Sequence, residues 1–78
     1  MLLRHSYGAA ELDCTTAIAL DPLYVKAYAR RGSARIAMQR YAQAEGDFKQ
    51  VVKLEPSNKQ AHAELKAIHQ VLPSQPSR

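Results

Sequence analysis

The sequence is poor in cysteine, glycine, proline and aromatic residues. Its 78 residues include one cysteine, Cys14, and no tryptophan. A single cysteine excludes an internal disulfide framework and suits a reducing compartment. Three glycines and four prolines leave long stretches in which a helix can continue without a breaker. The apolar start ends at Arg4, so no signal peptide or membrane span is expected there.

The residues that are plentiful are small, apolar and basic. The hydrophobic fraction is 46%, and much of it is alanine, which favours closely packed helices. Lysine and arginine number 11 against 7 acidic residues, giving a net charge of +4. This balance favours an acidic partner, although an ordinary solvated surface has the same count. A chain of this length allows one domain with a modest core.

The sequence repeats itself when it is shifted by 34 residues. Eight positions then carry the same residue in both copies, which is far more than chance alignment of a short chain gives. A period of 34 residues is that of the tetratricopeptide repeat. The matching pairs are Tyr7 and Tyr41, Ala10 and Ala44, Glu11 and Glu45, Asp13 and Asp47, Leu20 and Leu54, Pro22 and Pro56, Ala27 and Ala61, and Ala29 and Ala63.

Apolar residues at three- and four-residue steps predict four helices, over about 6–20, 23–38, 41–54 and 59–71. Pro22 and Pro56 stand at the two turns that end the first and third helices, because proline cannot continue a helix. Ser57 or Asn58 is expected to cap the fourth helix.

These ranges divide the chain into four parts. Residues 1–22 are expected to be the second half of a repeat, and residues 23–56 a complete repeat. Residues 57–72 are expected to form a C-terminal capping helix, since their outer face is polar and no further repeat follows. Residues 73–78 are expected to be a disordered tail. The predicted fold class is all-α: a tetratricopeptide helical-repeat solenoid fragment of antiparallel helix pairs, with about four helices.

The complete repeat follows the tetratricopeptide pattern best in its second half, where Ala44, Phe48 and Pro56 occupy the pattern's Ala, Phe and Pro positions. Tyr28 replaces the usual tryptophan. Gly32 costs helix stability, so it is expected to admit the neighbouring helix at Ala44 or Phe48. A structural role is therefore predicted for Pro22, Gly32, Ala44, Phe48 and Pro56.

A basic pair marks the helix expected over residues 23–38. Lys26 and Arg30 are one turn apart, and Ser33 and Ala37 lie on the same stripe. Two cations can bind one carboxylate through charge-assisted hydrogen bonds, and small neighbours leave room for a peptide backbone. By spacing alone, a solvated cationic face is the more common explanation of such a stripe.

The run Lys26-Ala-Tyr-Ala-Arg30-Arg31 resembles the third repeat of carboxylate-clamp co-chaperones. The chain looks most like the RNA polymerase II-associated protein and sperm-associated antigen group of that family. This resemblance implies a cytoplasmic adaptor or scaffold that binds the acidic C-terminal peptide of a cytosolic heat-shock chaperone through Lys26 and Arg30. The peptide-binding set is then Lys26, Arg30, Ser33 and Ala37. The family's other ligands come from the first helices of two preceding repeats, which have no counterpart here, so a fragment or short isoform is expected.

Three further arginines are expected to have other roles. Arg31 and Arg35 point away from the basic stripe, where their stems are expected to cover apolar surface. Arg40 follows the same helix and is expected to lie at the negative end of its dipole.

No catalytic or cofactor site is expected. The sequence offers no nucleophile, base and orienting group together, and no phosphate-binding loop. His62 and His69 lack the further ligands that zinc needs, so no metal is expected either. Nucleic-acid binding is not expected, because no aromatic residues alternate with the cations.

A second function class stays open. The chain could be a structural or self-associating repeat fragment with no peptide binding of its own. Its N-terminal repeat edge would then expose apolar residues and form a homo-oligomer. The candidate edge residues are Tyr7, Ala10, Cys14 and Leu2 or Leu3.

Overall fold

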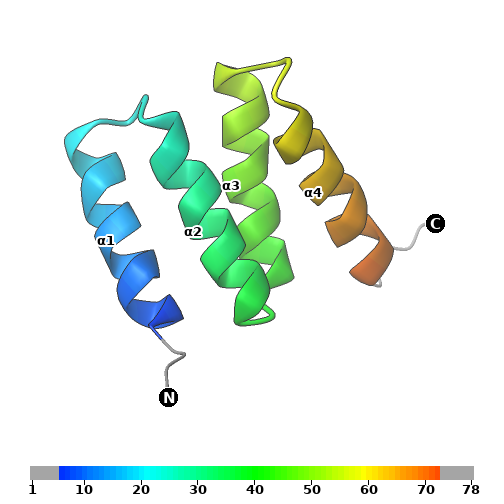
Figure 1. Ribbon diagram of the computed structural model, residues 1–78, viewed down its shortest axis with the longest axis horizontal. Helices are drawn as coiled ribbons and strands as arrows, with labels where there is room; N and C mark the ends of the chain where they lie inside the picture. Colours follow the sequence, from blue (N-terminus) through cyan, green and yellow to red (C-terminus); the bar gives the residue numbers. More distant parts are fainter. Residues whose placement is uncertain (1–5, 73–78) are drawn as a thin grey trace.

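The computed structural model of the protein describes residues 6–72, and every regular element in that range is a helix. The helices are α1 (Tyr7–Leu20), α2 (Val25–Ala37), α3 (Tyr41–Leu54) and α4 (Lys59–Val71). Successive helices run in opposite directions along a row with α1 and α4 at its two ends (Figure 1). The all-α prediction is confirmed for this range, with α2 beginning later than expected. The predicted tail 73–78 and the edge residues Leu2 and Leu3 lie outside the described residues.

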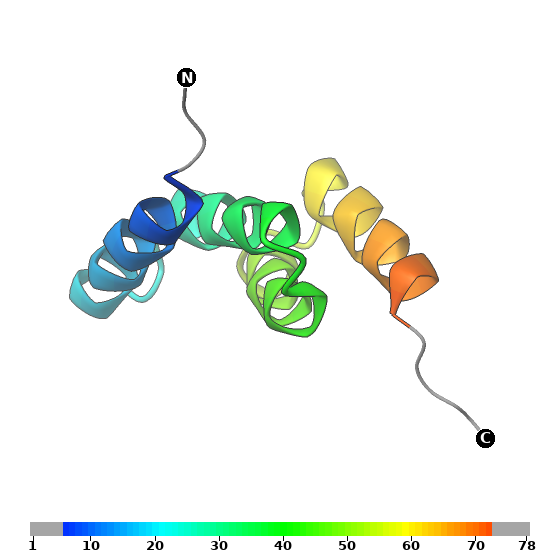
Figure 2. The same cartoon turned by 90° about the horizontal axis from the view of Figure 1, so that it is seen from below.

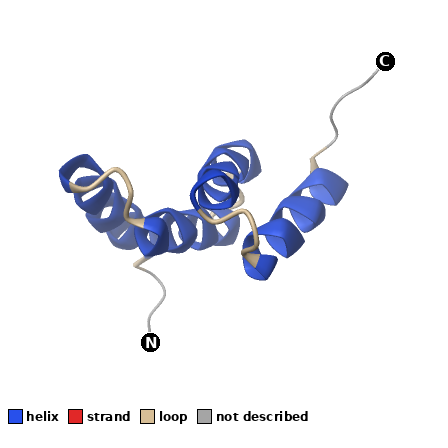
Figure 3. Ribbon diagram, turned by 90° about the horizontal axis from the view of Figure 1, so that it is seen from above, coloured by secondary structure: helices blue, strands red, loops and turns tan. Residues whose placement is uncertain are grey.

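Each helix packs mainly on its neighbours in sequence: α1 on α2, α2 on α3, and α3 on α4. Figures 2 and 3 show that α3 lies to one side of α2 and α4. Such nearest-neighbour contact is typical of a solenoid, in which each unit buries the apolar face of the next. In the range 6–72, α1 therefore has only one helix beside it, and part of its surface is uncovered.

The connections follow from local sequence. The Asp21 carboxylate accepts a hydrogen bond from the Leu23 N–H at 3.1 Å, which closes the turn at Pro22. The Asn58 side chain accepts from the Ala61 N–H at 2.8 Å, so Asn58 is the predicted cap of α4. Between α2 and α3 the chain reverses at Gln39, whose φ of 63° is left-handed.

The core is centred on Phe48, which is fully buried with Ala44 and Val51 on α3. Ala61 and Ile68 of α4 are 1% exposed and close the other side. Stripes of small and large apolar residues from three helices thus meet in one cluster.

Gly32 makes this close packing possible. A Cβ atom at this position would lie 2.6 Å from Cε2 of the Phe48 ring, well inside van der Waals contact. The predicted close approach at Gly32 is therefore present, and its partner is Phe48 rather than Ala44.

Candidate functional site

The exposed side of α2 carries the predicted basic stripe. Lys26, Arg30, Ser33 and Ala37 are all exposed and follow one another along the helix. The residues of α2 that are buried lie on its other side and pack on α1 and α3: Ala27, Tyr28, Gly32 and Ala34. Because the stripe takes no part in this packing, its side chains are available to a partner.

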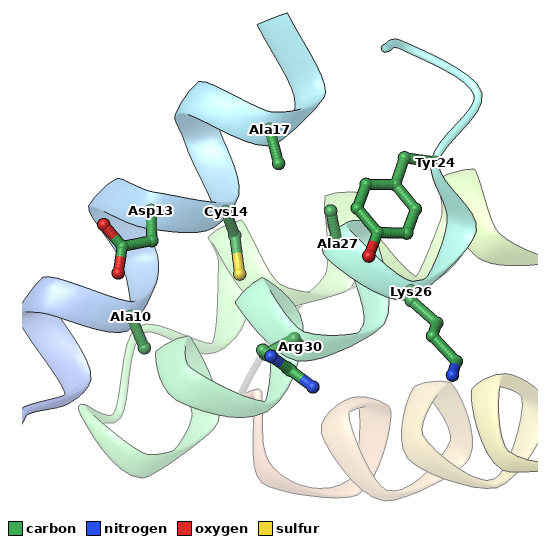
Figure 4. Close-up of a pocket in the computed structure, with 8 residues that line it drawn as sticks. All are labelled: Ala10, Asp13, Cys14, Ala17, Tyr24, Lys26, Ala27 and Arg30. Carbon is green, nitrogen blue, oxygen red and sulfur yellow. The ribbon is translucent and has the colours of Figure 1, made fainter. Parts of the chain in front are cut away.

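A cavity of about 270 Å³ opens between α1 and α2 beside the stripe. Lys26 and Arg30 line it from α2, while Asp13 and Cys14 line it from α1 (Figure 4). Ala10, Ala17, Tyr24 and Ala27 complete the lining. The structure thus brings Lys26 and Arg30 to one cavity. Ser33 and Ala37 are not part of the lining and lie farther along the stripe.

Neither cation is engaged within residues 6–72. Lys26 and Arg30 form no hydrogen bond or ion pair with any described residue. Each ammonium or guanidinium group can therefore meet an anion without first breaking an internal contact. Two unpaired cations one turn apart attract a carboxylate more strongly than either does alone.

Arg31 and Arg35 have a role that the sequence did not predict. Both bind Asp47 of α3, which is only 2% exposed. Arg31 donates from Nε and Nη2 at 2.7–3.2 Å, and Arg35 donates from Nη1 at 3.0 Å. This hydrogen bonding raises the pKa of the Arg31 guanidinium. The sequence did not predict these ion pairs, which a buried carboxylate requires. The Arg31 guanidinium also lies over the Tyr28 ring, 5.9 Å from its centroid.

The network extends to α1 through Glu11. Arg35 Nε donates to Glu11 at 2.7 Å, and Arg40 Nη1 donates to the same carboxylate at 3.1 Å. Arg31 Nη1 donates to the Thr15 hydroxyl at 3.1 Å. Arg40 therefore pairs with α1, a contact that the sequence did not predict, and its role at the helix dipole stays a prediction. The recurrence of aspartate at positions 13 and 47 does not reveal the network in the sequence, because Asp13 takes no part in it.

Glu11 makes the stability of the protein depend on pH. The hydrogen bond from Arg35 holds the pKa of Glu11 below its ordinary value of 4.5, against the opposing effect of desolvation. The contribution of this carboxylate to stability is therefore fully present above about pH 4.5. It is lost as the pH falls through the lower pKa that Glu11 has in the folded protein.

Glu11→Gln is expected to lower the melting temperature at pH 7 and to have a smaller effect at pH 3. The reason is that the wild-type carboxylate is protonated at low pH and no longer binds Arg35 as an anion. Thermal melts of both proteins, followed by circular dichroism at several pH values, measure this difference. If the difference in melting temperature between wild type and Glu11→Gln stays constant from pH 7 to pH 3, the contact between Arg35 and the Glu11 carboxylate does not stabilise the protein as assigned.

The remaining candidate groups are accounted for by packing and local contacts. Cys14 is 5% exposed, and burial raises the pKa of its thiol, which makes it a packed side chain and not a reactive one. His62 contacts the Pro56 carbonyl, and His69 contacts the Glu45 carboxylate. Within residues 6–72, no group of three or more His, Cys, Asp or Glu side chains is arranged to hold a metal ion.

Comparison with known proteins gives the chain clear relatives. No protein-family model matches the sequence. RNA polymerase II-associated protein 3 of Mus musculus is 50% identical over 68 residues, which are 87% of this chain and 10% of that protein. The Xenopus tropicalis protein of the same name is 53% identical over 71 residues, 91% of this chain and 11% of that protein. The chain thus spans about a tenth of the length of the curated relatives it matches.

Solved structures agree in fold. The first TPR of Spaghetti (RPAP3), bound to the HSP90 peptide SRMEEVD, has a TM-score of 0.85 and 47% identity, over 87% of this chain and 54% of that one. The second TPR domain of human RPAP3, in complex with the HSP70 peptide SGPTIEEVD, has a TM-score of 0.77 and 52% identity, over 81% of this chain and 52% of that one.

The fold is therefore that of the tetratricopeptide-repeat proteins, a class built from stacked antiparallel helix pairs. Within this class its sequence and fold are like those of the TPR domains of RNA polymerase II-associated protein 3, as the sequence predicted. None of the helices between residues 6 and 72 has the length and apolar character needed to cross a bilayer.

Proposed function

We propose that this chain is a co-chaperone adaptor module that binds the acidic C-terminal peptide of a heat-shock chaperone. The observation that carries the proposal is the exposed pair Lys26 and Arg30, which has no internal partner within residues 6–72 and lies at one cavity. Support also comes from the similar TPR domains that were solved with the peptides SRMEEVD of HSP90 and SGPTIEEVD of HSP70.

The pair is suited to a peptide's terminal carboxylate. The Arg30 guanidinium can bind it with two parallel hydrogen bonds, and the Lys26 ammonium adds a mobile point charge. Ser33 and Ala37 are short, so the peptide backbone can lie close to α2 beyond the two cations. The expected orientation thus has the last residue of the peptide near Lys26 and Arg30, with earlier residues along the stripe.

Binding by this chain alone is expected to be weak. Each charge-assisted contact contributes about 1.5–3 kcal/mol, and part of that is offset by ordering a flexible peptide. The result is a Kd on the order of 1 mM. The chain covers 54% of the length of the peptide-bound Spaghetti domain, so that domain has more surface with which to bind its ligand.

Titration with a peptide ending in Met-Glu-Glu-Val-Asp tests the proposal. Amide shifts in two-dimensional NMR spectra are expected to change along α2. Lys26→Ala and Arg30→Ala are each expected to weaken binding about tenfold, because each removes one charge-assisted contact. Lys53→Ala is the matched control, since Lys53 is an exposed cation on α3, away from the stripe.

A peptide with an amidated C-terminus is the second control and is expected to bind more weakly than the free acid. If the peptide leaves the spectrum unchanged, or if Lys26→Ala and Arg30→Ala bind as wild type does, the proposed function is wrong. All of these side chains are exposed, so each variant is expected to keep the wild-type fold.

The alternative is a self-associating structural fragment with no peptide binding of its own. It is favoured by exposed apolar side chains on and after α1: Leu12 at 66%, Leu20 at 82% and Leu23 at 70%. Cys14 does not belong to this surface, contrary to the predicted edge, because it is buried against α2. Sedimentation velocity separates the two functions, since a monomer at all concentrations excludes the homo-oligomer.

The proposed function is binding and involves neither catalysis nor a cofactor. It implies a cytoplasmic location, where a chaperone tail of this kind is available. Fractionation of cells that express the tagged chain would test the location.

A further inference from the structure

The cavity that holds Lys26 and Arg30 is also lined by a tyrosine, Tyr24, at the start of α2. Tyr24 is 45% exposed, so it is partly covered and partly accessible to solvent. Its hydroxyl forms no hydrogen bond with any of residues 6–72. In contrast, Tyr28 is 6% exposed, and its hydroxyl donates to the Pro22 carbonyl at 3.0 Å. The Tyr24 hydroxyl is therefore a donor that stays available to a ligand of the cavity.

The internal repeat shows what a purely structural residue does at the position of Tyr24. Asn58 comes 34 residues later and caps α4, since its side chain accepts from the Ala61 N–H at 2.8 Å. Tyr24 has the same place before α2, and its side chain makes no capping hydrogen bond. A helix that lacks such a cap is less stable than one that has it. Tyrosine at position 24 thus gives α2 no capping advantage, which favours a role in binding.

The surroundings of Tyr24 favour an anionic hydrogen-bond acceptor. Lys26 and Arg30 bring two positive charges to the cavity. The first turn of α2 contains no acidic residue, so the positive end of the helix dipole is not neutralised there. In Figure 4 the Tyr24 hydroxyl and the Lys26 ammonium are both directed toward the bottom of the view, while Asp13 lies at the opposite end of the lining. The negative charge of Asp13 is therefore well separated from the Tyr24 hydroxyl.

We propose that Tyr24 determines which last residue the peptide site accepts, by donating a hydrogen bond to the side-chain carboxylate of a C-terminal aspartate. This inference rests on the proposed function, in which Lys26 and Arg30 bind the terminal carboxylate. Tyr24 precedes Lys26 on the helix, whereas Ser33 follows it, so Tyr24 lies at the end of the stripe where the last residue of the peptide is expected.

A C-terminal aspartate suits this arrangement because it carries two carboxylates close together. One of them binds the two cations, and the other accepts from the Tyr24 hydroxyl. A hydrogen bond to a charged acceptor is stronger than one between neutral groups. The Tyr24 hydroxyl therefore favours peptides with an acidic last residue over peptides that end in a neutral residue.

Two peptides test this preference, one ending in Met-Glu-Glu-Val-Asp and one ending in Met-Glu-Glu-Val-Ala. Both keep the terminal carboxylate, so they differ only in the last side chain. Tyr24→Phe is expected to bind the aspartate peptide about tenfold more weakly than wild type does, because one hydrogen bond to a charged group is lost. It is expected to bind the alanine peptide as wild type does. Affinities are measured by titration in two-dimensional NMR spectra.

Tyr28→Phe is the matched control. It removes a hydroxyl one turn away that already has an internal acceptor, so it is expected to lower the melting temperature and to leave the preference between the two peptides unchanged. Tyr24→Phe keeps the ring and is expected to melt as wild type does.

The outcomes separate this inference from the proposed function. If Tyr24→Phe binds the aspartate peptide as wild type does, or weakens both peptides equally, Tyr24 does not recognise the last side chain. The proposed function still stands in that case, provided that Lys26→Ala and Arg30→Ala weaken binding. If wild type binds neither peptide, both proposals are wrong.

Discussion

Gly32→Leu is expected to abolish cooperative folding of the domain. A Cβ atom at position 32 would lie 2.6 Å from Cε2 and 2.9 Å from Cδ2 and Cζ of the Phe48 ring. That ring is fully buried, so it has no space into which it can move. Leucine adds three carbons beyond Cβ, and overpacking of this kind costs about 3 kcal/mol or more. A domain of this size has a stability of only about 5 kcal/mol. Circular dichroism melts and urea titrations measure the loss.

A matched control lies on the next helix. Apart from its chain neighbours and the backbone of its own helix, a methyl group added at Gly46 would have no atom within 4 Å, so it would enter open space. Gly46→Ala is therefore expected to stabilise the protein by about 0.5–1 kcal/mol, since alanine is the better helix former. Combining Gly32→Ala with Phe48→Leu is expected to recover part of the stability that Gly32→Ala alone removes. If Gly32→Leu melts at the same temperature as wild type, α2 and α3 are not in close contact at this position.

Asp47→Ala is expected to destabilise the protein by about 3 kcal/mol. Removing one partner of a buried ionic cluster leaves the other partners desolvated and unpaired, and this costs about 3–5 kcal/mol. The low end applies here, because the Arg31 and Arg35 side chains are each 15% exposed and regain some contact with water. The free energy of unfolding is measured by urea titration.

Asp13→Ala is the control for this change. Asp13 has the equivalent repeat position and the same side chain, but it is exposed and unpaired within residues 6–72. Its substitution is expected to change stability by less than about 0.5 kcal/mol. If Asp47→Ala and Asp13→Ala lower the free energy of unfolding equally, the contacts of Asp47 with Arg31 and Arg35 do not stabilise the protein.

These expectations separate stability from binding on a single helix. Gly32, Arg31 and Arg35 hold α2 against its neighbours, whereas Lys26 and Arg30 are exposed and pair with no described residue. Substitutions on the exposed stripe can therefore be interpreted as binding effects. Substitutions on the buried side of α2 lower the amount of folded protein, so a loss of binding in those variants cannot be assigned to the binding site.

Local patterns were sufficient to predict most of the architecture. Apolar side chains at three- and four-residue steps predicted four helices, and the structure has them within a few residues of the expected bounds. Pro22 and Asn58 act within their own turns, so their effects can be read without knowledge of the rest of the chain. The stripe of Lys26 and Arg30 was also predictable, because residues one turn apart on a helix share a face whatever that helix packs on.

The partners of Arg31, Arg35 and Arg40 could not be predicted in the same way. Arg35 meets Glu11 across 24 residues and Asp47 across 12, and both contacts depend on how α1 and α3 pack on α2. An arginine stem can either cover apolar surface or reach a carboxylate, and the sequence does not distinguish these outcomes. Only the distance between helices shows that a carboxylate is within reach.

By itself the sequence determined the repeat, the helices, the turns and the exposed basic pair, since each depends on residues within one or two helical turns of one another. The tertiary structure decided which charges are paired and which stay available. Asp47 is buried between two arginines, while Asp13 at the equivalent position is open. The reason is physical: a carboxylate's partners are set by the helices that pack around it, and α3 has a helix on each side in the described range where α1 has one.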